Sequence, residues 1–407
     1  MIEFDLSDGV FNKKDVLTDR YDPDEIKERD DQFDQMKSAY RQMLKNGDGA
    51  TNILIYGSTG VGKTVAVKEF LESIQTYGDE LDHLDVEVIW ENVKGRSGHK
   101  ASVAVTNDII EAQDPAKTGH TQDRVYSKLI EAIDRRNASH IVFALDEIDS
   151  LGTDDDLLYK LSRMDSHDFL DVNTKISIIG ISNSFKYMEE LSSRVREVLN
   201  PKEILFPEYN ANELASILKP RAEKAFNDGV ISDAEIRHAA ALTARERGSA
   251  RRGLDILAEA GSLADDEDTA QITSEHLERA CEEVEHNLIK QDIRSISTQS
   301  QIIIQSLMML EQKGVDRPRI KRLYSLYKTL AERADVPVRS RRTVKRKLQD
   351  LNLKDFVNIA TINNGSDGGR YNIYELSLDV GMVNDVISSI DRLDTSGNQS
   401  LKNYSDV

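Results

Sequence analysis

The chain has few of the residues that form disulfides or zinc sites and lacks the long apolar runs that span membranes. Cys281 is the one cysteine among 407 residues, so no internal disulfide can form. The 8 histidines are scattered, and no His/Cys spacing resembles a zinc site. No apolar run approaches the roughly 20 residues that a bilayer span needs, and the N-terminus lacks a basic stretch followed by an apolar core. These absences predict a cytoplasmic protein without a membrane partner.

Acidic residues dominate the charge. The chain has 72 Asp or Glu against 53 Lys or Arg, which gives a net charge of -19. One interpretation is ordinary solubility. The other, which the composition favours, is a cytoplasm of high salt, where dense carboxylates keep the surface hydrated and salt screens their repulsion. The length predicts two or three domains, and 39% hydrophobic residues suffice for packed cores.

Short apolar runs recur along the first half of the chain. Five of them have the length of strands, at residues 52–56, 86–90, 141–145, 176–182 and 203–206. Helical spacing precedes the first run, at residues 24–46, and separates later ones, as at residues 122–136. Alternation of buried strands with helices predicts a parallel sheet covered on both faces.

A glycine-rich loop follows the first run and precedes a helical pattern. Its residues are Gly57, Ser58, Thr59, Gly60, Val61, Gly62, Lys63 and Thr64, which match G-x-x-x-x-G-K-[ST]. The alternative is a glycine turn with a chance Lys-Thr pair, but the strand-loop-helix context favours a phosphate loop. Its glycines let N–H groups converge on the β-phosphate, Lys63 reaches the β- and γ-phosphates, and the Thr64 hydroxyl is offered to Mg²⁺. The expected ligands are ATP or ADP and Mg²⁺.

Polar side chains end two later strands. Asp146 and Glu147 follow the run at 141–145, and Asn183 follows the run at 176–182. Buried acids are costly without a cation, so we expect Asp146 in the shell of the metal and Glu147 to orient and deprotonate water. A solvated loop and a simple turn are the alternatives. Asn183 would orient the water near the γ-phosphate, and Asp149 serves either this site or the next helix as its cap.

Beyond Pro207 the pattern becomes helical, and then strongly basic. Residues 313–347 hold thirteen Lys or Arg and three Asp or Glu. A basic helix at 340–351 precedes a predicted hairpin, which is the order of a winged helix. The alternative is a solvated basic face. The predicted DNA contacts are Arg339, Arg341, Arg342, Lys345 and Arg346 at the helix, and Arg370 after the turn of the hairpin.

The combination of motifs resembles a known family. GSTGVGKT, IVFALDEID and GISN resemble AAA+ ATPases. Three further stretches, SSRVREVLNPKEILFPEYNANELASIL, GSARRGLDILAEAGSLA and YDPDEIKERDDQFDQM, resemble the arginine-finger, sensor 2 and adenine-side segments of archaeal origin-recognition and cell-division-control initiators. The resemblance runs over about residues 15–390 and, with the acidic composition, points to a haloarchaeal member.

The resemblance implies roles for particular residues. Asn183 becomes sensor 1, Arg251 the sensor 2 arginine, and Arg194 the arginine finger, with Arg196 as second candidate. Tyr21, Tyr209 and Arg221 join the nucleotide site. Arginine suits these roles because its planar, permanently charged fork pairs bidentately with phosphate. Without the resemblance, each arginine would be interpreted as a surface ion pair.

The resemblance also implies an architecture and a function. Its parts are a polar tail (1–20), an AAA+ base domain with a parallel sheet (21–207), an all-α lid (208–292), a winged-helix domain (296–395) and a second polar tail (396–407). The implied protein is a nucleoid-associated replication initiator that binds double-stranded origin DNA, assembles on it and recruits or loads the replicative helicase. ATP hydrolysis would be slow and act as a switch.

Two other functions fit the same motifs. One is a nucleotide-gated transcriptional regulator or an accessory paralogue without origin activity, which only DNA targets would separate from an initiator. The other is a clamp-loader-like remodelling ATPase, which the basic helix disfavours.

Overall fold

The computed structural model describes residues 9–81, 83–110, 115–164, 170, 173–245, 248–363, 370–390 and 393. The chain divides into two compact units, Met1–Cys281 and Glu282–Val407. Within the described ranges, no helix combines the length and the apolarity that a membrane crossing requires.

A five-stranded parallel sheet forms the base of the first unit, with strand order β2-β3-β4-β1-β5. The strands are β1 (Ile53–Tyr56), β2 (Val86–Asn92), β3 (His140–Asp146), β4 (Lys175–Ser182) and β5 (Lys202–Leu205). All five predicted strands are present, with ends within two residues of the prediction. Because β1, β4 and β3 are neighbours and run in parallel, the loops after them meet at one edge of the sheet.

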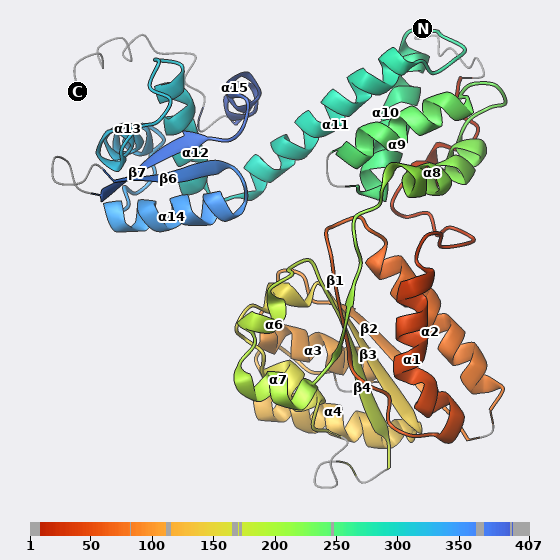
Figure 1. The fold of residues 1–407 in the computed structure, drawn as a ribbon. Coiled ribbons are helices and arrows are strands. Elements are labelled where there is room, and N and C mark those ends of the chain that lie inside the picture. The colour runs from red at the N-terminus through yellow and green to blue at the C-terminus, as the bar shows by residue number, and fades with distance from the viewer. Residues whose placement is uncertain are drawn as a thin grey trace, which may run out of the picture. The chain divides into compact units, whose positions relative to one another are not determined.

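Helices cover both faces of this sheet (Figure 1). They are α1 (Asp30–Asn46), α2 (Lys63–Asp79), α3 (Gly98–Ile109), α4 (Gln122–Arg136), α5 (Asp156–Leu161), α6 (Tyr187–Glu190) and α7 (Ser193–Leu199). In Figure 1, α1 and α2 lie on one side and α3, α4, α6 and α7 on the other. The helix predicted from residue 24 begins only at Asp30, because Glu28 has a left-handed φ of 63° and Arg29 is not helical.

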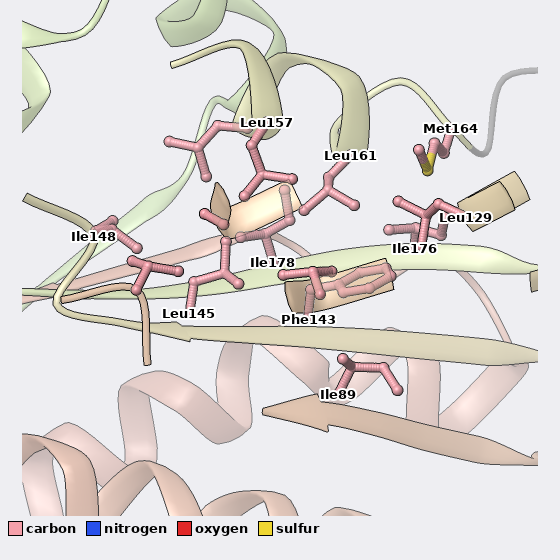
Figure 2. Packing of buried hydrophobic residues seen from close by; sticks show 14 of the residues in the cluster. Ile89, Leu129, Phe143, Leu145, Ile148, Leu157, Leu161, Met164, Ile176 and Ile178 are labelled. Carbon is pink, nitrogen blue, oxygen red and sulfur yellow. The ribbon is translucent and has the colours of Figure 1, made fainter. Parts of the chain in front are cut away.

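The core of the base lies between β2, β3 and β4 and the helices α3, α4, α5 and α7. Figure 2 shows Leu157 and Leu161 directed from α5 toward Ile178 of β4, with Met164 close to Ile176. All residues of β3 are buried, which accounts for its uninterrupted apolar sequence. The apolar packing on this face holds the end of β3, with its acids, at a fixed position.

The lid follows the base in the same unit. Its helices are α8 (Ala211–Ala225), α9 (Asp233–Arg245), α10 (Ala250–Asp266) and the first part of α11 (Ser274–Ser295). A capping box starts α8: Asn210 accepts from the N–H of Glu213, whose carboxylate accepts from the N–H of Asn210.

The first described residues belong to the lid and correct the prediction of a polar tail at 1–20. Residues 9–20 contain a short 3-10 helix, Lys14–Leu17, whose Val16 and Leu17 are buried. Phe11 stacks on Phe226 of the lid, with ring centroids 5.2 Å apart. Scattered apolar residues here lack helical or strand periodicity because they pack against a partner distant in sequence. Residues 1–8 lie outside the described residues.

The second unit holds the order predicted for a winged helix. Its elements are α12 (Thr298–Glu311), α13 (Ile320–Arg333), α14 (Arg341–Leu353), β6 (Val357–Asn363), β7 (Arg370–Leu376) and α15 (Val380–Ser388). β6 and β7 pair antiparallel. One apolar core joins all of them, including Leu307, Tyr327 and Leu348. The predicted turn residues 364–369 and the tail 396–407 lie outside the described part of the chain.

Candidate nucleotide and nucleic-acid sites

A cavity of 420 Å³ opens beside the phosphate loop, between the base and the lid. Most of the predicted nucleotide residues line it: Tyr21, Thr59, Gly60, Gly62, Lys63, Thr64, Asp146, Glu147, Asn183, Tyr209, Arg221 and Arg251. Gly57, Ser58 and Val61 of the loop do not line it. The Ser58 hydroxyl donates to Glu208 instead (2.8 Å), and Val61 is fully buried.

The glycines of the loop meet the lid as well as the cavity. Gly60 and Gly62 have left-handed φ values of 82° and 86°. A Cβ on Gly60 would stand 2.1 Å from the Ser249 hydroxyl, and one on Gly62 would stand 2.9 Å from the Tyr209 hydroxyl. Glycine is therefore required both for the backbone conformation and for the close approach of the lid. The loop ends where α2 begins, so the positive end of that helix faces the cavity.

Lys63 is held by three acceptors. Its Nζ donates to the carbonyl oxygens of Gly57 (2.7 Å) and Ser58 (2.8 Å) and to Oδ1 of Asn183 (2.9 Å). Burial lowers the pKa of Lys63 to about 8, against the opposing effect of Asp146. Lys63 thus links the phosphate loop after β1 to Asn183, the residue that follows β4.

Thr64 and Asp146 offer two oxygens side by side. The Thr64 hydroxyl donates to Oδ2 of Asp146 at 3.1 Å, and the N–H of Glu147 donates to Oδ1 of Asp146 at 2.9 Å. Burial raises the pKa of Asp146, while the hydrogen bonds from Thr64 and Glu147 lower it. Hydroxyl and carboxylate oxygens are hard ligands, and Mg²⁺ in such sites takes only one or two protein ligands beside phosphates and water. The pair therefore fits Mg²⁺.

The Glu147 carboxylate has a partner that the sequence did not reveal. Its two oxygens lie 3.1 Å from Nζ of Lys94, a lysine whose side chain is 72% exposed. The backbone of Glu147 is left-handed, with φ of 57°, so the chain turns sharply after β3. In this arrangement the predicted base is held by a flexible cation from the loop after β2.

Asn183 is fixed from two directions. Its side chain accepts from Lys63, and its backbone N–H donates to Oδ1 of Asp149 at 2.9 Å. Asp149, for which the sequence left two interpretations, lies inside the short 3-10 helix Ile148–Leu151 and holds the end of β4. The acidic residues at the end of β3 and just after it therefore make three separate contacts, through Asp146, Glu147 and Asp149.

The lid side of the cavity is built with the help of residues 16–21. Arg221 of α8 donates to the carbonyl oxygens of Val16 (2.7 Å) and Thr18 (3.0 Å), and its guanidinium lies 4.6 Å from the ring centroid of Tyr21. Arg251, at the start of α10, lies 3.6 Å from Asp19. Asp19 also lines the cavity, and no motif pointed to it, since its partner lies far along the chain.

Arg194 and Arg196 lie on α7 and do not line the cavity. The Arg194 guanidinium stacks on Tyr159, 3.8 Å from its ring centroid, and lies 3.6 Å from Asp156. Arg196 donates to Ser193 at 3.4 Å. More than half of the Arg194 side chain is exposed. Neither arginine is brought to the nucleotide residues of its own chain.

The basic helix α14 separates an apolar face from a charged one. Val344, Leu348 and Leu351 are buried in the core of the second unit. The six predicted DNA-contacting residues are all exposed: Arg339, Arg341, Arg342, Lys345, Arg346 and Arg370. Arg370 begins β7, opposite Asn363 of β6 and next to the predicted turn. The spacing of the buried residues turns the basic side chains to solvent, as an interface with phosphates requires.

Comparison with known proteins gives the family. Residues 45–185 match the AAA domain model, 215–282 the Cdc6 AAA+ ATPase-type lid domain and 291–386 the CDC6 C-terminal winged helix domain. ORC1-type DNA replication protein 1 of Haloarcula marismortui is 35% identical over 96% of this chain and 95% of its own length. The chain belongs to the family of ORC1-type DNA replication proteins. ORC1-type DNA replication protein 8 of Halobacterium salinarum is 36% identical over 94% of this chain and 96% of its own.

Solved structures of ORC1-type proteins share the architecture. The Aeropyrum pernix ORC1 protein in complex with DNA has a TM-score of 0.78 at 28% identity, covering 94% of this chain and 98% of that one. The Aeropyrum pernix ORC2 protein, in ADPNP–ADP complexes, has a TM-score of 0.59 at 19% identity and shows the fold alone; it covers 94% of this chain and 99% of that one. The resemblance to archaeal initiators and the predicted fold class are confirmed. An ORC1-type protein with an AAA domain is a nucleotide-binding replication initiator.

Proposed function

We propose that this ORC1-type initiator binds ATP or ADP with Mg²⁺ in the cavity beside the phosphate loop and binds double-stranded origin DNA through its second unit. It then recruits or loads the replicative helicase. Slow hydrolysis of ATP serves as a switch. The observation that carries the proposal is the convergence of Lys63, the Thr64–Asp146 pair, Asn183 and the lid residue Arg251 on one cavity.

Each polar residue has a chemical task in this proposal. Thr64 and Asp146 hold Mg²⁺, which neutralises charge on the phosphates when bound. Glu147, once released from Lys94, accepts the proton of the attacking water. Asn183 orients that water with its amide, which changes no charge. Because Glu147 is engaged by Lys94, hydrolysis needs a rearrangement before the proton transfer, and a slow rate is expected.

The lid is the element that reports the nucleotide. Its helix α10 starts on the phosphate loop, since the N–H of Ala250 donates to the carbonyl of Gly60 at 3.0 Å. Arg251, one residue later, is paired with Asp19 on the surface of the cavity. A γ-phosphate competes with Asp19 for Arg251, because both are anions and phosphate offers a bidentate partner. Occupation of the cavity by ATP thus changes the contacts of α10.

Arg194 supports assembly of several copies on DNA. Its exposed guanidinium lies away from the cavity of its own chain, so the nucleotide it can reach is one held by a neighbouring subunit. Stacking on Tyr159 keeps it extended over α5 until such a neighbour is present.

The basic face of α14 supports DNA binding. A helix of this kind enters the major groove, and Arg370 at the hairpin contacts backbone or minor groove. Affinity falls about 0.9 log units per phosphate contact for each tenfold rise in salt. In the high-salt cytoplasm that the acidic composition favours, base-edge contacts and shape readout must supply the rest, which predicts sequence specificity. The Aeropyrum pernix ORC1 complex with DNA supports the same partner.

Occupancy of the protein on its own genome tests the function. An initiator is expected at a few intergenic sites, and the same sites should give footprints with the purified protein. Occupancy at many promoters would replace this function with that of a nucleotide-gated transcriptional regulator. Calorimetry with ADP tests the cavity independently, and a folded protein without affinity for adenine nucleotides would contradict the nucleotide part.

A further inference from the structure

Arg29 is a buried cation beneath the phosphate loop. It precedes α1 and is 2% exposed. Its Nε and Nη2 donate to the carbonyl oxygen of Val61 at 3.1 and 2.9 Å. Nη2 also donates to the carbonyl oxygen of Pro207 at 2.8 Å, and Nη1 to that of Glu28 at 3.2 Å. The guanidinium lies 3.6 Å from the ring centroid of Tyr209.

These partners make Arg29 an unusual buried charge. Its hydrogen bonds to Val61, Pro207 and Glu28 go to main-chain carbonyls, and the side chain of Tyr209 is a further partner whose ring covers the plane of the guanidinium. Desolvating a guanidinium is unfavourable, and a burial of this kind is a poor source of stability by itself. What Arg29 does supply is geometry, because a planar fork with fixed donors holds several acceptors at set directions.

The first acceptor belongs to the peptide that joins Val61 to Gly62. A trans peptide is planar, so its C=O and N–H point in opposite directions. With the Val61 carbonyl held on Arg29, the N–H of Gly62 faces away from Arg29, and Gly62 lines the cavity. A hydrogen bond at the carbonyl also polarises the N–H of the same peptide, which strengthens its bond to an anion.

The second acceptor lies in the segment that leads from the base to the lid. Pro207 follows β5, and Tyr209 precedes the cap of α8. Arg29 bonds the carbonyl of Pro207 and covers the ring of Tyr209, whose hydroxyl lies where a Cβ on Gly62 would meet it. One side chain therefore holds both the phosphate loop and the connection to the lid.

We propose that Arg29 is a positioning residue for nucleotide binding. It aims the Gly62 N–H at the β-phosphate and ties the base–lid connection to the same loop. The inference rests on the proposed nucleotide function of the cavity.

The test compares ADP with AMP, which lacks the β-phosphate. Dissociation constants are measured by calorimetry, with competition for the weaker ligand, on the full chain. Arg29→Met should weaken ADP binding about tenfold or more, the effect of losing a charge-assisted hydrogen bond, and change AMP binding less than about threefold. Arg29→Lys keeps the charge without the fork and should fall between. Arg136, which donates to the carbonyl of Ile109 away from the cavity, provides the control Arg136→Met, with both affinities unchanged.

The outcomes separate the inference from the function beneath it. Equal losses for ADP and AMP, or no loss for either, in Arg29→Met overturn the positioning role. Should Arg29→Met fail to fold, the ADP-to-AMP ratio of Arg29→Lys decides, and a ratio equal to that of the wild type overturns the proposal. Absence of ADP binding by the wild-type chain instead refutes the proposed function, and the inference with it.

Discussion

Substitution of Gly60 by alanine tests whether the phosphate loop and the lid are in direct contact. Its φ of 82° is left-handed, and an added Cβ would stand 2.1 Å from the Ser249 hydroxyl and 3.1 Å from Cβ of Arg251. Gly229 is a matched control, because its φ is 80° and nothing lies within 4 Å of its added Cβ. Gly60→Ala therefore adds both backbone strain and a clash with the start of α10, whereas Gly229→Ala adds strain alone.

The backbone strain and the clash add in Gly60→Ala, whereas Gly229→Ala has the strain alone. A left-handed conformation costs an alanine about 1–2 kcal/mol of unfolding free energy. Overpacking against Ser249 adds about 1–3 kcal/mol for Gly60→Ala. At about 2–4 °C per kcal/mol for a unit of this size, Gly229→Ala lowers Tm by about 2–8 °C and Gly60→Ala by about 2–12 °C more.

Thermal denaturation of both variants without nucleotide measures this difference. ADP titration of both variants completes the experiment, and only Gly60→Ala should weaken ADP binding, since only it displaces the loop. Equal losses of Tm for the two variants would refute the contact between the loop and α10. Unchanged ADP affinity in Gly60→Ala would refute the role of that contact in holding the loop for the nucleotide.

Other perturbations test single residues. Lys63→Ala should abolish ATP binding, because it removes the ammonium that faces the phosphates; unchanged affinity by calorimetry would count against the loop. Glu147→Gln should retain ATP binding and lose turnover, and persistent phosphate release would move the base elsewhere. Lys94→Ala should raise the ATPase rate several-fold in a phosphate-release assay, because it frees Glu147, and a rate at or below wild type would contradict this. Arg342→Ala with Arg346→Ala should lower DNA affinity about tenfold or more in footprinting, while full protection would place the contacts elsewhere.

The sequence predicted those parts of the site whose residues lie close together along the chain. The phosphate loop lies between a strand and a helix that are adjacent in sequence, so its residues follow from one short stretch. Asp146 was identifiable because acids directly after a fully apolar strand are unusual. The buried face of α14 followed in the same way from the spacing of Val344, Leu348 and Leu351.

Contacts between distant segments were not predictable. Arg29 meets Pro207 across 178 positions, and although it lies in the segment that resembles the adenine side of the family's site, no local pattern there points to its partners. The packing of residues 9–20 on the lid has the same origin, because it depends on Phe226 and Arg221. The partner of Glu147 was missed because Lys94 lies on a loop, where no periodicity fixes the direction of a side chain.

The three acceptors of Lys63 have a consequence for exchange of the bound molecule. An ammonium has three donors, and here the protein already occupies each of them. A phosphate oxygen therefore binds Lys63 only by displacing an amide or carbonyl oxygen from it. The net free energy gained is the difference between the hydrogen bond to phosphate and the hydrogen bond that it replaces. When the phosphate leaves, the ammonium of Lys63 returns to those oxygens, so its donors stay hydrogen-bonded. Such a residue favours reversible binding of the nucleotide over permanent retention, which suits the nucleotide switch proposed above.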